Sequence, residues 1–570
     1  MNAVWHRFYE EGVPTTIEYP DDSLPQLLDK GASEFPEKIA LRFFVNPSLP
    51  STTMTFTELR ERTRRFATAL DALGVKKGDR VAIMLPNSPA YVVAFYGALR
   101  IGAVVVNTNP LYVSREMKHQ FADSGSETVV LLNTFMPRLE EIWSDTPVKN
   151  VIVVDIAGDM AWPFRMLVHY AQKKQGEYVR VQRSERVHFF EELLDRYPPI
   201  PPTVAIDKHD VALFQYTGGT TGTPKAAMLT HFNLVANALQ IAAWVHKGER
   251  GKEKLMAAIP FFHVYGMTTC MIYGLSQGFE VVMIPRPRPV DIVMKVLQKT
   301  RCTIFPGVPT LYTAINNHPD VQKYDLSSIK ACISGAAPLP VEVQETFERL
   351  TGGRLIEGYG LTEAAPVTHG NPFFGKRKIG SIGVPFPDVE AKIVDSETRK
   401  ELGVGEEGEL IIRGPQLMKG YWNRPEETAE TIRGEWLYTG DMAKMDEDGF
   451  FYIVDRKKDM IIASGFKVLP REVEEVLYTY PAVQEAVVAG VPDPYRGETP
   501  KAYVVLKAGQ QATAEQIIAH CRSNLAAYKV PSSVEFRAEL PKTMVGKILR
   551  RVLVEEEQKK LAGKPDAGNA

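Results

Sequence analysis

The sequence is poor in cysteine, and its cysteines are not placed for a shared task. The four of them, Cys270, Cys302, Cys332 and Cys521, are widely scattered, and no C-x-x-C pair occurs. Zinc sites and disulfide frameworks need cysteines at short or regular spacings. The pattern therefore argues against both and fits a reducing cytoplasm.

Long apolar runs and an excess of one charge are also absent. The longest apolar candidate, residues 91–106, is broken by Arg100, and a membrane span needs about 18 or more such residues. The opening MNAVWHRFYEEG lacks the apolar core of a secretory signal peptide, and the closing KPDAGNA carries no lipidation or peroxisomal motif. The 67 Lys and Arg nearly balance the 69 Asp and Glu, so nothing favours nucleic acid as a partner. We expect a cytoplasmic protein.

The chain of 570 residues is too long for one compact core, so several domains or subdomains are expected. Residues 55–73 match an amphipathic helix that starts with a capping box of Thr55 and Glu58. Short apolar runs then alternate with helical patterns, at 81–84, 104–106, 129–132, 151–154, 211–214 and 281–284. Such alternation predicts βαβ units, and hence mainly parallel sheets with helices on both faces.

The pattern changes beyond about residue 380. Segments 390–394 and 408–412 alternate polar and apolar residues, as antiparallel strands do. A smaller unit follows residue 458, with helices expected near 471–478 and 514–525 and strands near 486–491 and 502–506. We predict an α/β protein: an N-terminal domain, residues 1–457, of parallel-sheet αβ subdomains plus a smaller β-rich subdomain, followed by a small α+β C-terminal domain, residues 458–570.

The most informative stretch is YTGGTTGTPKAAMLTH, residues 216–231, with a helix-compatible segment at 232–244 after it. Its glycines let backbone N–H groups approach a ligand closely, and its threonines and lysine add donors and positive charge. The loop suits a polyphosphate, although it lacks the Gly-Lys-Ser/Thr ending of the common P-loop. The candidate phosphate-binding residues are Thr217, Gly218, Gly219, Thr220, Thr221, Gly222 and Lys225.

Four further segments hold candidate site residues: PFFHVYG at 260–266, SGAAP at 334–338 with EGYGLTE at 357–363, YTGD at 438–441, and PKTMVGKILRR at 541–551. Small residues let an adenine ring lie against the backbone, and Tyr359 can stack on it. Glu363 is a natural magnesium ligand, because Mg²⁺ prefers one or two carboxylates with phosphate oxygens and water. Structural alternatives exist for each segment: His263 as a core residue, Glu363 in a helix cap, Asp441 in a turn, and Lys547 as a solvated lysine.

The five segments, in this order, resemble the adenylate-forming superfamily of acyl- and aryl-CoA synthetases, peptide-synthetase adenylation domains and luciferases. The resemblance covers about residues 210–550. The closing motif, GFFYIVDRKKDMI at 449–461 and NTNPLY at 107–112 are most similar to bacterial long-chain fatty acid–CoA ligases. The resemblance implies ATP, Mg²⁺ and coenzyme A as cofactors and cosubstrates, and a fatty acid as the substrate.

The resemblance also implies roles for individual residues. Lys547 is the adenylation lysine that bridges the carboxylate and the α-phosphate, with Lys225 and His263 as further catalytic residues. Thr217 and Glu363 hold Mg²⁺. The implied nucleotide contacts outside the loop are Gly335, Ala336, Ala337, Glu357, Gly358, Tyr359, Gly360, Thr362, Asp441 and Arg456. The implied acyl pocket is His263, Val264, Tyr265, Gly266 and Val308, continued by residues 267–275.

These roles imply an ATP-dependent acid–thiol ligase that forms AMP. The fatty carboxylate attacks the α-phosphorus of ATP, which needs charge neutralisation rather than a base, and the thiol of coenzyme A then expels AMP. No G-x-S-x-G elbow or other protein nucleophile is evident. By resemblance, the C-terminal domain rotates on a hinge at Lys458 between the two steps, which withdraws Lys547 and places Gly465 beside the pantetheine channel.

Residues 155–190 resemble an insertion in the alternating pattern. Phe164, Leu167, Val168 and Ala171 share one helical face. The basic residues that follow are Lys173, Lys174, Arg180, Arg183 and Arg186. The simpler interpretation is a surface helix packed on the domain. The alternative is a basic amphipathic segment in peripheral, reversible contact with the inner face of the cell membrane.

Several functions share these motifs. A medium-chain or aryl acid–CoA ligase differs in pocket depth, near residues 264–273 and 308–312. A peptide-synthetase module is disfavoured because no carrier domain follows residue 550, and nothing indicates a luciferin-shaped pocket. A catalytically dead lipid-uptake or scaffold protein is disfavoured because Glu363, Asp441 and Lys547 are all present. Chain-length preference, pathway and oligomeric state, with a homodimer as one option, are left open.

Overall fold

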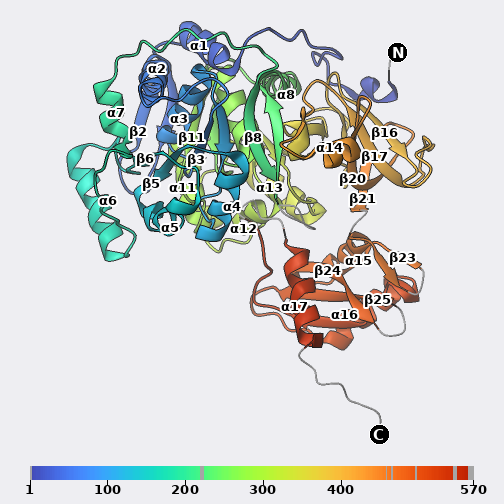
Figure 1. Cartoon of the computed structure of the whole chain (residues 1–570). Helices are drawn as coiled ribbons and strands as arrows, with labels where there is room; N and C mark the ends of the chain where they lie inside the picture. The colour runs from blue at the N-terminus through green and yellow to red at the C-terminus, as the bar shows by residue number, and fades with distance from the viewer. Residues whose placement is uncertain are drawn as a thin grey trace. The chain divides into compact units, whose positions relative to one another are not determined.

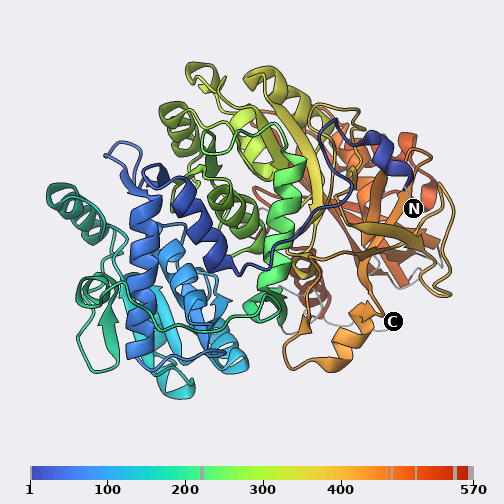
Figure 2. The same cartoon turned by 90° about the horizontal axis from the view of Figure 1, so that it is seen from above.

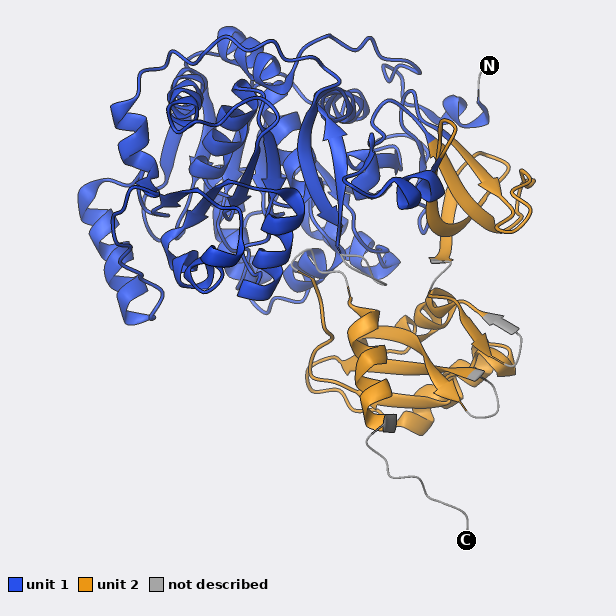
Figure 3. Cartoon of the chain, viewed as in Figure 1, with its two compact units in different colours: residues 1–218, 224–390, 413–432 blue, residues 219–223, 391–412, 433–570 orange. Residues whose placement is uncertain are grey.

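The computed structural model describes residues 3–217, 224–456, 459–463, 466–493, 497–543 and 548–562. The chain divides into two compact units (Figure 3). Unit 1 comprises residues 1–218, 224–390 and 413–432, and unit 2 comprises residues 219–223, 391–412 and 433–570. These limits follow compactness, and the boundary expected between residues 457 and 458 stays a prediction.

An eight-stranded sheet forms one half of unit 1, in the order β18-β9-β8-β4-β3-β5-β6-β7. The strands from β3 to β8 pair in parallel, whereas β9 and β18 add antiparallel strands at one edge. Five of the six predicted apolar runs therefore form strands of this sheet, and the sixth, residues 281–284, coincides with β11 (Glu280–Met283) of another sheet. The strands are β3 (Arg80–Met84), β4 (Val104–Asn107), β5 (Thr128–Leu132), β6 (Asn150–Val154), β7 (Val187–Phe189), β8 (Val211–Thr217), β9 (Lys225–Thr230) and β18 (Gly420–Tyr421).

Two four-stranded sheets form the other half of unit 1, in the orders β10-β11-β1-β2 and β12-β13-β14-β15. Ile304 links them, because it makes parallel bridges to Leu255 of β10 and Ala331 of β12. The strands are β1 (Ile39–Phe43), β2 (Thr52–Thr55), β10 (Lys254–Ala257), β11 (Glu280–Met283), β12 (Ala331–Ser334), β13 (Arg354–Gly360), β14 (Val367–Gly370) and β15 (Val384–Pro385).

Helices cover the sheets of unit 1, and α2 and α3 lie side by side in Figure 1 and Figure 2. Phe121 and Leu139 pack on alternate sheet residues such as Val106, while the intervening residues Ile83 and Val105 are equally buried on the other face. Both faces of the eight-stranded sheet are thus covered, as expected. The helices are α1 (Leu24–Glu34), α2 (Phe56–Ala72), α3 (Pro89–Arg100), α4 (Ser114–Ser124), α5 (Met136–Glu140), α6 (Trp162–Lys174), α7 (Phe190–Arg196), α8 (His231–Trp244), α9 (Val264–Gly266), α10 (Tyr273–Ser276), α11 (Val290–Thr300), α12 (Pro309–Asn316), α13 (Val341–Thr351) and α14 (Pro425–Thr431).

The predicted capping box starts α2. The Glu58 N–H donates to Thr55 Oγ1 at 3.2 Å, and the Thr55 N–H donates back to Glu58 Oε2 at 2.7 Å. Of the helices in the described residues, none has the length and hydropathy needed to cross a membrane.

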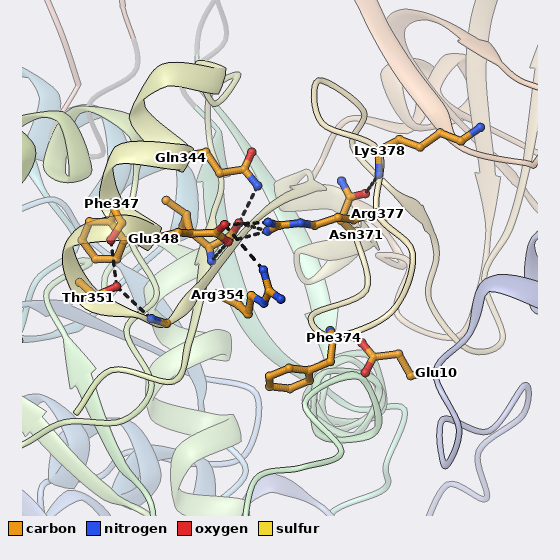
Figure 4. A network of polar contacts seen from close by, with 12 residues as sticks. Glu10, Gln344, Phe347, Glu348, Thr351, Arg354, Asn371, Phe374, Arg377 and Lys378 are labelled. Carbon is orange, nitrogen blue, oxygen red and sulfur yellow. Dashed lines mark hydrogen bonds and ion pairs between the residues drawn. The ribbon is translucent and has the colours of Figure 1, made fainter. Parts of the chain in front are cut away.

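A polar network fixes the start of β13 (Figure 4). Glu348 of α13 receives both Arg377 Nη atoms and the Leu355 N–H, and Gln344 Nε2 donates to Leu355 O at 2.8 Å. Burial alone would raise the pKa of Glu348, but the hydrogen bonds from Arg377 and Leu355 outweigh it and hold that pKa below its usual value. The network ties α13 and the loop around residue 377 to the strand that leads towards Glu363.

Unit 2 contains the antiparallel sheet predicted beyond residue 380 and an α+β part after it. The first sheet has the order β16-β17-β20-β19, with β21 on β20, and the second has the order β23-β22-β25-β24, with β26 on β25. Helices α15 and α16 pack on the second sheet through Val473, Leu477, Ile517 and Val504. The elements are β16 (Glu390–Val394), β17 (Gly408–Arg413), β19 (Ile432–Arg433), β20 (Trp436–Met445), β21 (Phe451–Arg456), β22 (Ile461–Ala463), β23 (Phe466–Val468), β24 (Val483–Asp493), β25 (Gly497–Leu506), β26 (Ser533–Phe536), α15 (Pro470–Tyr478), α16 (Ala514–Asn524) and α17 (Arg550–Ala562).

Candidate active site

The Gly/Thr loop joins two antiparallel strands. Thr217, the last residue of β8, pairs with Lys225, the first of β9, and Thr217 Oγ1 lies 3.4 Å from Lys225 O. Residues 218–223, and with them Gly218, Gly219, Thr220, Thr221 and Gly222, lie outside the described residues. The sequence did not reveal β9, and α8 begins only at His231, after the N-cap Thr230. A strand after the loop distinguishes this hairpin from the strand–loop–helix of a P-loop.

The side chain of Tyr421 in β18 contacts both the predicted metal ligand Glu363 and the loop lysine Lys225. Its hydroxyl donates to Glu363 Oε1 at 2.7 Å, and Lys225 Nζ lies 5.3 Å from the centroid of its ring. Lys225 Nζ also lies 4.0 Å from Glu427 Oε1. The pairing of Tyr421 with Ala227 of β9 creates this arrangement. Burial, and then the charge of Glu363, raise the pKa of Tyr421, so its hydroxyl stays a neutral donor.

The two predicted metal ligands are of the kind that Mg²⁺ prefers. Glu363 offers a carboxylate and Thr217 a hydroxyl, and both are half-buried hard oxygen donors. Within the described ranges, no three His, Cys, Asp or Glu side chains gather in a way that could hold a metal by themselves. One carboxylate and one hydroxyl fit an ion whose shell is completed by phosphate oxygens and water, which is the usual environment of Mg²⁺ at nucleotide sites.

The predicted adenine segments lie at the carboxyl ends of two neighbouring parallel strands, β12 and β13. Ser334, at the end of β12, pairs with Glu357 of β13, so Gly335, Ala336 and Ala337 emerge beside the EGYG segment. The Tyr359 ring is half-buried and meets His369 edge to face, with 5.8 Å between the centroids. Thr362 and Glu363 then begin a short 3-10 helix without a side-chain cap, so the helix-cap alternative is not supported.

One of the predicted nucleotide glycines has a packing role. A Cβ at Gly360 would lie 2.1 Å from Pro366 O, because β13 runs close to the chain that returns along β14. The fold thus requires a glycine at position 360, whether or not a nucleotide contacts it.

His263, the predicted carboxylate-orienting residue, sits at the N-cap of α9. Its Nδ1 accepts the Tyr265 N–H at 3.2 Å, which leaves the proton of the neutral ring on Nε2. Tyr265 itself is buried, and its hydroxyl lies 3.0 Å from Gly307 O and 2.9 Å from Ile333 O. Gly266 has no space for a side chain, because a Cβ would lie 2.4 Å from Pro260 O.

Buried amides that the sequence did not single out hold the segment before His263. Asn87 accepts the Phe261 N–H at 2.7 Å and donates to Ile259 O at 2.8 Å. Gln215 of β8 donates to Phe262 O at 3.0 Å, and Asn107 of β4 donates to Gln215 at 2.9 Å. Two elements of the parallel sheet and the loop after β3 therefore set the position of the predicted carboxylate site. No sequence signal marks these three amides, apart from the presence of Asn107 in the NTNPLY stretch.

An apolar cavity of about 20 Å³ lies beside the predicted acyl-pocket wall. Thr269 and Tyr273 line it from that wall, and the other lining residues are Ile241, Trp244, Val245, Ile304, Pro306, Ala331, Ile333, Val367, Phe373 and Phe386. Residues Met267–Ile272 form a π-helical turn, a feature found often at functional sites. The volume is enough for about one water molecule, so an alkyl tail would have to displace part of this wall. Val264 and Val308 are buried but do not line the cavity.

Unit 2 carries the predicted ribose ligand. Asp441 of β20 is buried, its N–H donates to Thr439 Oγ1 at 3.1 Å, and the Gly440 N–H donates to Glu409 Oε1 at 3.1 Å. Arg456 of β21 stands directly opposite Asp441 in the register, although only its backbone is described. The predicted hinge Lys458, channel residue Gly465 and catalytic Lys547 lie outside the described residues.

The fold and these segments define an AMP-binding enzyme, and the chain belongs to that family. The AMP-binding enzyme family matches residues 28–422, and the AMP-binding enzyme C-terminal domain matches residues 472–547. The predicted superfamily, fold class and enzyme assignment are confirmed.

Individual members of the family are similar to this chain over nearly its whole length. The chain is 46% identical to a long-chain-fatty-acid–CoA ligase of Bacillus subtilis, over 97% of this chain and 98% of the relative. It is 42% identical to the ligase of the same name in Escherichia coli O157:H7, over 99% and 100%. Among solved structures, an anthranilate CoA ligase in complex with anthranoyl-AMP is similar, with a TM-score of 0.84, 28% identity and coverage of 95% and 98%.

Proposed function

We propose that this chain is a long-chain fatty acid–CoA ligase, which converts ATP, a fatty acid and coenzyme A to acyl-CoA, AMP and pyrophosphate. The observation that carries the proposal is the identity of 46% to a ligase of that name over nearly the whole of both chains. The alternative is a medium-chain or aryl acid–CoA ligase, and the similarity to an anthranilate CoA ligase supports the aryl-acid form of it. The dead-enzyme alternative is opposed by the presence of Glu363, Asp441 and Lys547 in the sequence.

In the first step, a carboxylate oxygen attacks the α-phosphorus and the bond to the pyrophosphate oxygen breaks. Negative charge gathers on the phosphates, so the residues needed are donors and cations. We assign Lys225, the hairpin 217–225 and Lys547 to that task, and Nε2 of His263 to the orientation of the carboxylate. Bound Mg²⁺ would supply charge neutralisation, with Glu363 and Thr217 as its protein ligands. Thr362 is assigned to the α-phosphate, and Asp441 and Arg456 to the ribose.

In the second step, the thiol sulfur of coenzyme A attacks the acyl carbonyl, and AMP leaves with the bonding electrons. The proposal includes a mobile C-terminal domain, residues 458–570, that turns at Lys458 and exchanges Lys547 for the loop at Gly465. The support is the matched C-terminal family domain at 472–547.

The acyl tail is assigned to the region of the apolar cavity between α8 and the π-helical turn. Its lining is almost free of polar surface, which suits an alkyl chain better than a charged acid. We also propose a cytoplasmic location with reversible contact at the inner face of the cell membrane.

A pyrophosphate-release assay over acids from acetate to oleate, with benzoate and anthranilate included, tests the substrate class. Release should be fastest with long-chain acids, and a preference for aryl acids would overturn the proposal in favour of its alternative. Lys547→Ala should abolish acyl-adenylate formation but leave thioester formation from supplied acyl-AMP mostly intact. An equal loss of both steps would contradict the role of Lys547.

A further inference from the structure

Helix α6 turns a row of large apolar side chains towards solvent. Trp162, Met166, Leu167 and Tyr170 are 76%, 51%, 55% and 69% exposed. They are four of the fourteen large apolar side chains that are exposed in the described part of the chain, gathered on one helix of 13 residues. Figure 1 and Figure 2 show α6 at the periphery of unit 1. An exposed patch of this kind marks an interaction surface.

The opposite side of α6 is already used for packing. Val168 is buried and, with the half-buried Phe164, packs against Ala157, Met160, Val45 and Leu49. Asp155 holds the same side, because His169 Nε2 lies 2.8 Å and Arg165 Nη2 2.9 Å from its carboxylate. The structure therefore divides the face predicted from the sequence: Phe164 and Val168 point inwards, whereas Leu167 and Ala171 are exposed.

The exposed row has helical spacing and ends in positive charge. Trp162, Met166 and Tyr170 are four residues apart, so they stack along one side of the helix, and Lys173 and Lys174 continue that side by one turn. Helix α6 contains no Asp or Glu, whereas the whole chain has a net charge of −2. Both lysines are exposed, and Lys173 Nζ lies over the Tyr178 ring at 4.9 Å.

We propose that α6 is a docking surface for an anionic lipid bilayer. Trp and Tyr prefer the interface between water and lipid, and lysines beside them reach the charged headgroups. A charge effect of this kind amounts to about fivefold in partitioning for each lysine near an anionic surface. One helix of this size gives reversible contact with the bilayer, so the enzyme can dissociate from the membrane. This inference rests on the membrane contact included in the proposed function and names the surface that makes it.

A second copy of the chain fits this surface less well. Four side chains of about 200 Å² each, exposed to roughly two-thirds, offer about 500 Å², below the roughly 800 Å² per partner of a stable interface. The basic end of the row would also meet its own charge in a symmetric pair. An anionic surface complements both the apolar row and the lysines.

The test is flotation of the full chain with vesicles of phosphatidylcholine, with and without phosphatidylglycerol. Wild type should float with the anionic vesicles and lose most of this binding at about 1 M salt, where the screening length falls to about 3 Å. The variant Trp162→Gln/Met166→Gln/Tyr170→Gln keeps the inner face of α6 and should partition at least about tenfold less. Lys173→Gln/Lys174→Gln should lose about 25-fold on anionic vesicles only.

The matched control is Ile200→Gln/Val341→Gln/Ile379→Gln, which removes three exposed apolar side chains elsewhere in unit 1 and should float like wild type. Quenching of Trp fluorescence by brominated lipid should fall in Trp162→Phe if that indole enters the bilayer. All variants should keep wild-type pyrophosphate release with a short soluble acid, which separates this inference from the ligase activity.

The possible results distinguish the membrane contact, the α6 surface and an interface between copies of the chain. Failure of wild type to float would overturn the proposed membrane contact and this surface with it. Equal flotation of wild type and the triple α6 variant would overturn the surface alone. A wild-type dimer in light scattering that the triple α6 variant converts to a monomer, without any flotation, would make α6 an interface between copies.

Discussion

Replacement of Tyr421 by Phe removes the hydroxyl that donates to Glu363 at 2.7 Å and leaves the ring under Lys225 in place. A hydrogen bond to a charged group is worth about 1.5–3 kcal/mol. Glu363 is half-buried, so water replaces part of the lost bond, and the lower half of that range applies. About 1.5–2 kcal/mol corresponds to roughly 10- to 30-fold. We therefore expect acyl-adenylate formation to slow by about that factor.

The assay is a single turnover of ATP and oleate without coenzyme A, so that acyl-AMP formation is observed by itself. A second measurement is the affinity for Mn²⁺, followed by electron paramagnetic resonance in the presence of ATP, which reports on the placement of Glu363 rather than on turnover. Both should change in Tyr421→Phe, because Tyr421 is a positioning residue that acts through this carboxylate.

Tyr19→Phe is the matched control. The Tyr19 hydroxyl also donates to a carboxylate, Asp388 Oδ2, at 2.8 Å, and burial raises the pKa of both tyrosines. The two variants should lose similar thermal stability, while only Tyr421→Phe alters adenylation and Mn²⁺ affinity. If adenylation and Mn²⁺ affinity stay at the wild-type level in Tyr421→Phe, or if both variants slow equally, Tyr421 is merely structural and the reasoning is refuted.

Three further predictions concern stability. Burial lowers the pKa of His231 to about 4, and its Nδ1 accepts the Leu24 N–H at 3.3 Å. The folded protein therefore holds the neutral ring. Its contribution to the free energy of unfolding is complete above about pH 6.5 and is lost as the pH falls towards 4, by about 3 kcal/mol. In urea unfolding from pH 7 to 4, the free energy of unfolding of His231→Asn should depend less steeply on pH than that of wild type. Glu348→Gln leaves the half-buried Arg377 without its counter-charge and should cost about 2 kcal/mol in urea unfolding, whereas adding Arg377→Met should recover part of that loss; simple additivity would contradict the coupling. Gly266→Ala places a Cβ 2.4 Å from Pro260 O and should cost at least about 3 kcal/mol, or prevent folding; wild-type thermal stability would show that the turn relaxes.

The parallel sheet of unit 1 is predictable because a strand buried on both faces needs an uninterrupted apolar run. The runs at β3, β5 and β6 contain such residues, and these strands lie where the pattern predicts them. Strand β9 has no such pattern, because KAAMLT mixes a lysine, two alanines and a threonine, and only its pairing with β8 reveals it. Strand β18 has two residues and carries no pattern at all.

The polar residues of the site also fall into two groups: those that a sequence motif indicates, and those whose role only the structure shows. Motif residues such as Glu363 and Lys225 are recognisable because their types and spacing have a chemical use. Tyr421 and the amides Asn87 and Gln215 act on those motifs through contacts between residues far apart in the chain, and Tyr421 lies 58 residues from Glu363. A tyrosine or an amide is common in any sequence, so its partner becomes visible only when the sheet order is known.

The sheet order also explains why Lys225 and Glu363, which come from separate motifs, lie beside the same tyrosine side chain. Lys225 begins β9, and β9 lies between β8 and β18 in the sheet. Met418, just before β18, donates its N–H to Glu363 O at 2.8 Å, so the backbone of the carboxylate segment is bound to the same short strand that presents Tyr421. A shift of β18 would therefore move the support of Glu363 and the ring under Lys225 at once. The antiparallel edge of the sheet thus gives both charged side chains a common rigid base.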